Sequence, residues 1–378
     1  MERKGSSKQG LDLKAFQIPI EKYERNMNKK SSKEKKKEIL DLFTNYNQLR
    51  SEEEFEDVKN NLYSACKRGD LELIKIYLSE AIKNDSKDMI FKIDRENKTA
   101  SLFKVNTHKE QIIIPRTIIH ESVEYLITSI TGMSNNIKTL KFVDDSAVKT
   151  IYGNTFKYLS HIEEIYFPAS LTELKEGWCR SAYKLTKLII SPSNGQFIYK
   201  DDKYLLGKSD PNKDEFDILL FVRRDIKNFS IPSNIKIIAS HAFDDCKYLT
   251  KVETPPNSNL QIIGESSFSH TNISEIFIPS TVQKICECAF EYCENMSKVD
   301  IPPNSSLQTL EEGVFSNSLI EEIYFPASLK ELEEGWCFGL DNLNKITISP
   351  SNGQFMMYED KCLFGKSDSK KDEFDILF

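Results

Sequence analysis

The sequence has 378 residues, of which 39% are hydrophobic and 29% charged, and its formal net charge is -7 at pH 7. This balance is that of a folded soluble protein and excludes a wholly disordered chain. No run of 18 apolar residues occurs, and the opening MERKGSSKQG lacks the apolar core of a secretory signal. We therefore expect no membrane span and, from the sequence as written, a cytoplasmic location.

The N-terminal part of the chain is basic, because residues 1–50 contain 13 Lys and Arg against 7 Asp and Glu. We predict a disordered basic arm over residues 1–30. The lysine cluster NMNKKSSKEKKKEIL at 26–40 has the composition of a segment that binds nucleic acid, an anionic membrane surface or an import receptor. It holds no aromatic residue that could stack on bases, which favours a solvated arm and argues against nucleic acid as a partner.

Residues 31–90 differ in kind, because their apolar side chains recur at helical spacing. The stretch DLELIKIYLSEAIK at 70–83 begins with Asp70, which can cap a helix, and places Leu73, Ile74 and Tyr77 on one face. Together with the preceding NLYSACKRG it is similar to the helix pair of an ankyrin repeat. The sequence predicts a small helical region here, which is either a cap on the following domain or an ankyrin-like element.

A short repeat organises the second half of the chain. Residues 231–347 divide into alternating units of 23 and 24 residues, of which IPSTVQKICECAFEYCENMSKVD at 278–300 is the best formed. Each unit has a proline, which ends a strand, a short alternating strand, and a turn with a phenylalanine. One unit cannot bury its own apolar edge, so the units must stack as coils of a solenoid. We expect the recurrent phenylalanines to stack along its interior, at Phe243, Phe268, Phe290 and Phe315.

A longer repeat is superimposed on the short one. The segment EEIYFPASLTELKEGWC at 163–179 recurs with two changes at 321–337, which is 158 residues later. Each copy precedes an insert, or island, that opens with ISPSNGQF, and the islands lie at 190–230 and 348–378. The second island stops before its counterpart does, so we expect the chain to end inside a unit. Trp178 and Trp336 should fill space beside the base of each island.

The pattern IPxxVxxIxxxAFxxCxxLxxVxIP resembles the BspA-like subclass of leucine-rich repeat proteins, which includes proteins of the surface-antigen type. The resemblance implies a right-handed solenoid with a parallel β-sheet on one side, a role in adhesion or protein binding, and no catalysis. On this basis residues 142–378 are the repeats with their two islands, and residues 91–141 are an N-terminal cap with a hairpin around Glu96 and Asn97. It also implies the cell surface as an alternative location.

Candidate catalytic and metal-binding groups are few. Cys286 and Cys288 form a single CxC without a second pair, and the other cysteines mostly recur with the period of the repeat. We therefore interpret the cysteines as reduced, buried thiols. The sequence contains no phosphate-binding loop, dinucleotide-binding fingerprint, nucleophile elbow or zincin motif. We predict a protein that is not an enzyme and has no cofactor, no metal and no small-molecule substrate.

The outward side of the predicted sheet is the candidate binding site. Stacking brings equivalent positions of neighbouring strands to within about 4.8 Å, so they form columns. In one column Lys and Glu alternate, which the register and solubility of the stack are sufficient to explain. In the other column aromatic residues lie between acids, as on protein-binding surfaces. The candidate residues are Tyr166, Lys251, Glu253, Glu275, Phe277, Lys298, Asp300, Glu322, Tyr324 and Lys345.

Two functions are compatible with the sequence. The first is a protein-binding or adhesion module that uses the sheet face and the islands to hold a protein partner of unknown identity. The second is an intracellular scaffold that acts through its basic, ankyrin-like N-terminal region.

Overall fold

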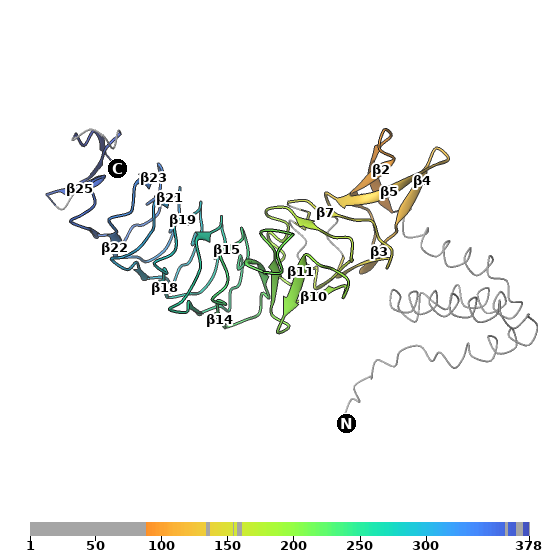
Figure 1. Ribbon diagram of the computed structural model, residues 1–378, viewed down its shortest axis with the longest axis horizontal. Helices are drawn as coiled ribbons and strands as arrows, with labels where there is room; N and C mark the ends of the chain where they lie inside the picture. The colour runs from red at the N-terminus through yellow and green to blue at the C-terminus, as the bar shows by residue number, and fades with distance from the viewer. Residues whose placement is uncertain are drawn as a thin grey trace, which may run out of the picture.

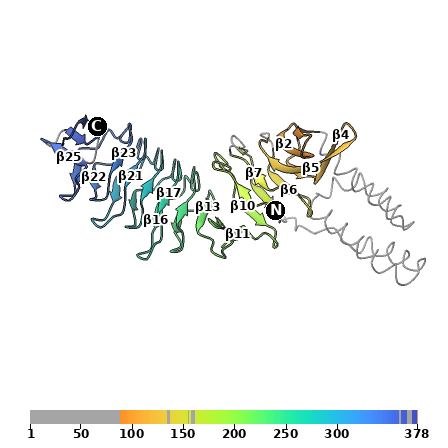
Figure 2. The same ribbon diagram turned by 45° about the horizontal axis from the view of Figure 1, so that its top comes forward.

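The computed structural model of the protein describes residues 88–133, 137–153, 155–156, 161–359, 362–367 and 373–377. The predicted basic arm and almost all of the predicted helical region, including the ankyrin-like pair, lie outside these residues. The described chain forms short strands joined by turns, and the strands stack into an elongated solenoid (Figures 1 and 2). This arrangement confirms the predicted repeat solenoid.

Each coil contributes a strand to each of two faces. We call the first the long-strand face, because its strands have three or four residues. Its hydrogen-bonded strand pairs are parallel. Its strands are β3 (Gln111–Ile114), β6 (Thr139–Phe142), β8 (Glu164–Phe167), β10 (Lys187–Ile190), β14 (Asn228–Ser230), β16 (Lys251–Glu253), β18 (Glu275–Phe277), β20 (Lys298–Asp300), β22 (Glu322–Phe325) and β24 (Lys345–Ile348).

The opposite side is the short-strand face, where most strands have only two residues. These strands also pair in parallel from coil to coil. They are β7 (Thr150–Ile151), β9 (Glu173–Leu174), β13 (Ile218–Val222), β15 (Ile237–Ile238), β17 (Ile262–Ile263), β19 (Lys284–Ile285), β21 (Thr309–Leu310) and β23 (Glu331–Leu332).

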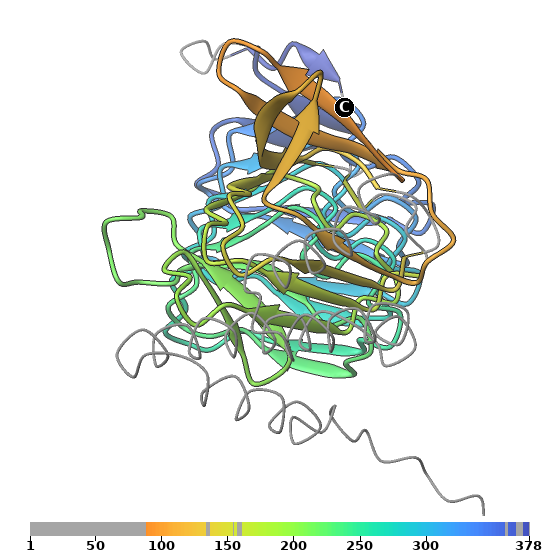
Figure 3. The same ribbon diagram turned by 90° about the vertical axis from the view of Figure 1, so that its right-hand side faces the viewer.

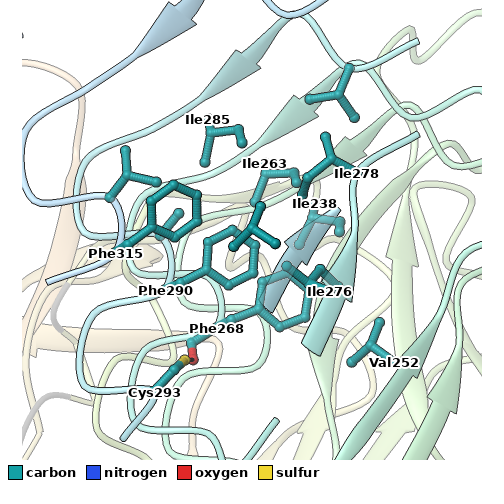
Figure 4. Packing of buried hydrophobic residues seen from close by; sticks show 14 of the residues in the cluster. Ile238, Val252, Ile263, Phe268, Ile276, Ile278, Ile285, Phe290, Cys293 and Phe315 are labelled. Atoms are coloured by element: carbon teal, nitrogen blue, oxygen red, sulfur yellow. Dashed lines mark hydrogen bonds between the residues drawn. The ribbon is translucent and has the colours of Figure 1, made fainter. Parts of the chain in front are cut away.

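The interior contains the predicted ladder of phenylalanines. The ring centroids of Phe243 and Phe268 are 4.5 Å apart, those of Phe268 and Phe290 are 5.1 Å apart, and those of Phe290 and Phe315 are 5.6 Å apart. Figure 4 shows three of these rings stacked beside the isoleucines of the short-strand face. The backbone follows the same spacing, since the amide of Phe268 donates to the carbonyl of Ala289 in the next coil at 2.8 Å. The 23- and 24-residue repeat therefore specifies which residues of adjacent coils pack together.

The N-terminal end of the solenoid is made of two hairpins. β1 (Met89–Asp94) pairs antiparallel with β2 (Thr99–Val105), and the Asp94 carboxylate accepts from the amides of Glu96 and Asn97, which confirms the predicted hairpin. β4 (Thr117–His120) pairs antiparallel with β5 (Val123–Ile130). β2 and β5 are themselves parallel, as are β3 and β6, so these residues already have the two-faced form of a coil.

The two islands are three-stranded antiparallel sheets. The first consists of β11 (Phe197–Lys200), β12 (Tyr204–Gly207) and β13, and the second of β25 (Phe355–Tyr358), β26 (Cys362–Gly365) and β27 (Ile376–Leu377). Each island is thus a hairpin, β11 with β12 or β25 with β26, extended by a third strand. In the first island β13 also pairs with β15, which brings the island into the short-strand face.

Side chains of the first island lie in two separate apolar clusters. Leu205 and Phe221 belong to the cluster of the N-terminal coils, whereas Leu206 and Leu219 belong to the cluster of the C-terminal coils. Leu205 and Leu206 are adjacent on β12 and therefore point to opposite sides, and the register shift that leaves Leu220 without a partner on β12 reverses the side between Leu219 and Phe221 on β13. The first island is therefore the structural joint between two cores.

Both tryptophans lie where the sequence predicts. The indole of Trp178 has its ring centroid 5.6 Å from Phe167 and 6.0 Å from Phe221 of the first island. Trp336 lies 5.4 Å from Phe325 in the second copy. Each tryptophan follows a glycine with a left-handed backbone, at φ 71° for Gly177 and 78° for Gly335, a conformation that costs other residues more.

The motif ISPSNGQF has an asparagine at its centre that ties each island to its coil. The side-chain amide of Asn194 donates to the carbonyls of Pro168 and Leu171, both at 2.9 Å. Its side-chain oxygen accepts from the amides of Gln196 and Phe197, both at 2.9 Å. Asn352 makes the same four bonds in the second copy. The duplication thus preserves a hydrogen-bond network as well as a sequence.

We predict that Asn194→Ala lowers the free energy of unfolding by about 2–4 kcal/mol, because it removes the side-chain partner of two amides and of the Leu171 carbonyl and leaves the Pro168 carbonyl with only the Leu171 amide. Urea unfolding followed by tryptophan fluorescence is a suitable measurement, since Trp178 lies beside this island. Asn212→Ala, in the exposed part of the same island, is the matched control and should change stability by less than about 0.5 kcal/mol. Equal effects of the two substitutions would show that the Asn194 network does not support the island.

Candidate protein-binding face

The long-strand face has the alternation that the sequence predicts. In β16, β18 and β20 the central residue is buried and the two flanking residues are exposed. Lys251, Glu253, Glu275, Phe277, Lys298, Asp300, Glu322 and Lys345 are exposed, and Tyr324 is half-buried. These nine residues form one continuous surface over β16 to β24. Tyr166 lies on the same face but in β8, on the N-terminal side of the first island.

The register of the strands produces the two expected columns. Glu275 lies opposite Lys298, and Phe277 lies opposite Asp300, in the parallel pair β18 and β20. The ion pairs follow the columns only in part. Lys345 reaches Glu322 on the neighbouring strand at 3.0 Å, whereas Lys251 bonds Glu253 within its own strand at 2.6 Å. Exposed pairs of this kind contribute little to stability, so the columns are available for other contacts.

Shallow hollows accompany the aromatic residues on this face. A hollow of about 230 Å³ lies beside Phe277, whose side chain is 42% exposed, and Glu275 and Asp300 are among its other lining residues. A second hollow, of about 550 Å³, lies beside Tyr324 and is also lined by Asp300. Aromatic side chains next to concave surface are typical anchors of protein interfaces.

The N-terminal part of the same face is different. Ile113 and Lys141 occupy outward positions on β3 and β6, yet they are only 1% and 9% exposed. The Lys141 ammonium lies 4.9 Å from the ring centroid of Tyr166. An apolar hollow of about 410 Å³ begins there and continues past Pro168 and Ile189. Sequence reasoning identified Tyr166 but missed Lys141, although the repeat spacing places both residues in one column.

A buried charged cluster at the joint between the two cores was also missed. Arg224 is 3% exposed and donates to the carbonyls of Ala242 and His241 at 3.0 and 3.1 Å. Its guanidinium lies over the ring of Phe221, and Asp244 is bonded to the His241 ring at 3.2 Å. The cluster closes the interior where the island meets the next coil, so its role is structural.

The thiols are free in the described residues, but they are not all buried. Cys179, Cys246 and Cys293 are buried, as predicted, whereas Cys286, Cys288 and Cys362 are only half-buried and Cys337 is exposed, so the prediction of burial was wrong for Cys337 and only partly right for the other three. Cys337 is the counterpart of Cys179 in the duplicated segment, and the contacts of Cys179 explain why the two differ in burial. Cys179 lies against Arg224, at the end of the first island, and donates to the carbonyl of His241 in the coil after it. Cys66 lies outside the described residues.

Neither a metal site nor a spanning helix emerges in the part of the chain that the structure describes. His, Cys, Asp and Glu side chains form no group of three or more that could hold a metal ion there. Within the same residues, no helix has the length and apolar character needed to cross a membrane.

We predict that alkylation of the native chain at about pH 8 modifies Cys337 much faster than Cys179, Cys246 or Cys293. Burial raises the pKa of the Cys179, Cys246 and Cys293 thiols to about 11, so at pH 8 almost none of them is present as the reactive thiolate. Mass spectrometry of iodoacetamide-treated protein, before and after unfolding in urea, measures the difference. Rapid native modification of Cys246 would contradict the packing described above.

Comparison with known proteins gives a family and several similar solved structures. The family model "BspA type Leucine rich repeat region (6 copies)" matches residues 103–201 and 218–344. A leucine rich cell surface protein from Faecalibacterium prausnitzii is 18% identical, with 70% of this chain and 94% of that chain covered and a TM-score of 0.38. The pneumococcal vaccine antigen PcpA is 17% identical, with 71% and 81% covered and a TM-score of 0.38. No curated protein matches the sequence.

Proposed function

Because the chain belongs to the BspA-type leucine-rich repeat family, we propose that its solenoid is a non-enzymatic module that binds another protein on the long-strand face. The observation that carries the proposal is the column of Phe277, Asp300 and Tyr324. The packing of the coils accounts for the inward residues and for the alternating Lys and Glu. It gives no reason for a phenylalanine ring that is 42% exposed between acidic neighbours. Such a ring gains free energy when a partner covers it.

The islands add a second, smaller element to this proposal. The apolar side chains of the first island pack into the two cores, so its exposed turns are what it offers a partner, and the longest of them is a loop. Residues 211–215 of that loop are exposed, and Figure 3 shows a green loop of the first island projecting from the side of the solenoid. We expect the loop to contribute contacts at the edge of an interface centred on the face.

We predict that the full-length protein captures its partner from an extract of the cells that produce it, and that Phe277→Ala/Tyr324→Ala removes most of that capture. Loss of the two rings removes the apolar anchors. Because Tyr324 also packs against the core, circular dichroism of the variant checks that the solenoid still folds. Tyr183→Ala/Tyr248→Ala is the matched control, because these exposed tyrosines lie outside the long-strand face. Capture of the same proteins by the Phe277/Tyr324 variant would reject the face as the binding site.

The finer proposal is that the module acts in adhesion at the cell surface. Protease applied to intact cells should then cleave the solenoid, and immunoblotting of the cells measures the loss. A chain spared by protease until the cells are opened would overturn this location. It would favour the scaffold function instead. That function depends on residues 1–90, almost all of which lie outside the residues that the structure describes.

A further inference from the structure

The duplicated segment provides two tyrosines whose surroundings differ. Tyr166 on β8 and Tyr324 on β22 occupy the same position in the two copies, 158 residues apart. The preceding strand β6 places Lys141 in the same column, with its ammonium 4.9 Å from the Tyr166 ring centroid. The strand before β22 is β20, and there the corresponding residue is Asp300. The first ring therefore has a cation from its own chain, whereas the second has a carboxylate as its neighbour.

Asp300 lies between two aromatic residues. Phe277 is opposite it in the register of β18 and β20, and Tyr324 is on the next strand, so the two rings are anchored two strand spacings, or about 9.6 Å, apart. Asp300 is exposed and lines both the hollow beside Phe277 and the hollow beside Tyr324. A carboxylate flanked by two aromatic side chains is suited to a cation, because the faces of the rings are also negative.

The nearby lysines leave this carboxylate open. Lys251 is bonded to Glu253, and Lys345 is bonded to Glu322. Lys298 precedes Asp300 by two residues, as Lys251 precedes Glu253, but the shorter aspartate is not joined to it by an ion pair in the described structure. The surface thus combines an exposed negative charge, two rings and adjoining hollows.

We propose that Phe277, Asp300 and Tyr324 form a site for a cationic side chain, lysine or arginine, of the bound protein. The carboxylate forms a charge-assisted hydrogen bond with the cation, and the two rings contact its faces. The partner's cation then lies beside the Tyr324 ring as the Lys141 ammonium lies beside the Tyr166 ring. This inference rests on the proposed function, because it assumes that the long-strand face is the binding face.

The test uses the full-length protein with ¹³C-labelled tyrosine and phenylalanine rings, observed by NMR during titration with the peptide acetyl-Gly-Ser-Arg-Ser-Gly-amide. The ring signals of Phe277 and Tyr324, assigned by substitution, should shift. Those of Tyr166 should not, because the Lys141 ammonium already lies against that ring. The same peptide with Glu in place of Arg should cause no shift. Asp300→Asn should weaken binding about tenfold, and Phe277→Ala or Tyr324→Ala about threefold each.

Two charge variants complete the test. Lys298→Gln should leave peptide binding equal or tighter, since it removes a competing positive charge. Asp300→Lys should abolish binding and move the Tyr324 signals towards those of Tyr166, because the new ammonium reproduces the Lys141 arrangement. Peptide binding by Asp300→Asn that equals the wild type would overturn the proposal.

The same variants separate this proposal from the broader one. If Phe277→Ala/Tyr324→Ala loses the captured partner while Asp300→Asn retains it fully, the face binds the partner but the cation site is rejected. If neither variant loses the partner, both proposals are rejected.

Discussion

Every coil of this protein depends on the coils beside it to bury its apolar edge. A single unit has one phenylalanine in its turn and a few isoleucines in its strands, which is too little to form a core. The rings of Phe243, Phe268, Phe290 and Phe315 stack on one another from coil to coil. The interior must therefore repeat, and its repetition is what the sequence displays most clearly.

The same constraint leaves the outward residues free to diverge. Stacking fixes where an outward side chain lies, because the strand spacing and register are set by the interior, but it does not fix which residue occupies the position. Tyr166 and Tyr324 illustrate the result, since identical segments present the same ring beside Lys141 in one copy and Asp300 in the other. A duplicated coil can acquire a new surface without any change in its packing.

Features that arise within one coil, or between equivalent positions of adjacent coils, were predictable from the sequence, and features that join unlike segments of the chain were not. The phenylalanine ladder, the two columns and the hairpin at Glu96 follow from local period and turn chemistry. The Arg224 cluster does not, because it brings together Cys179, the end of an island and the coil after it. The burial of Lys141 and the exposure of Cys337 also depend on neighbours that no local pattern specifies. The binding role of the predicted face residues stays a prediction.

The first island, whose strands β12 and β13 place neighbouring side chains in two different cores, has a mechanical consequence. In a plain stack of coils, a pulling force at the ends can detach one coil after another, because each coil contacts only its neighbours. Here the C-terminal coils cannot separate from the N-terminal ones without withdrawing Leu206 and Leu219 from one core while Leu205 and Phe221 remain in the other. The island thus makes the two cores resist extension together, because its strands hold side chains in both.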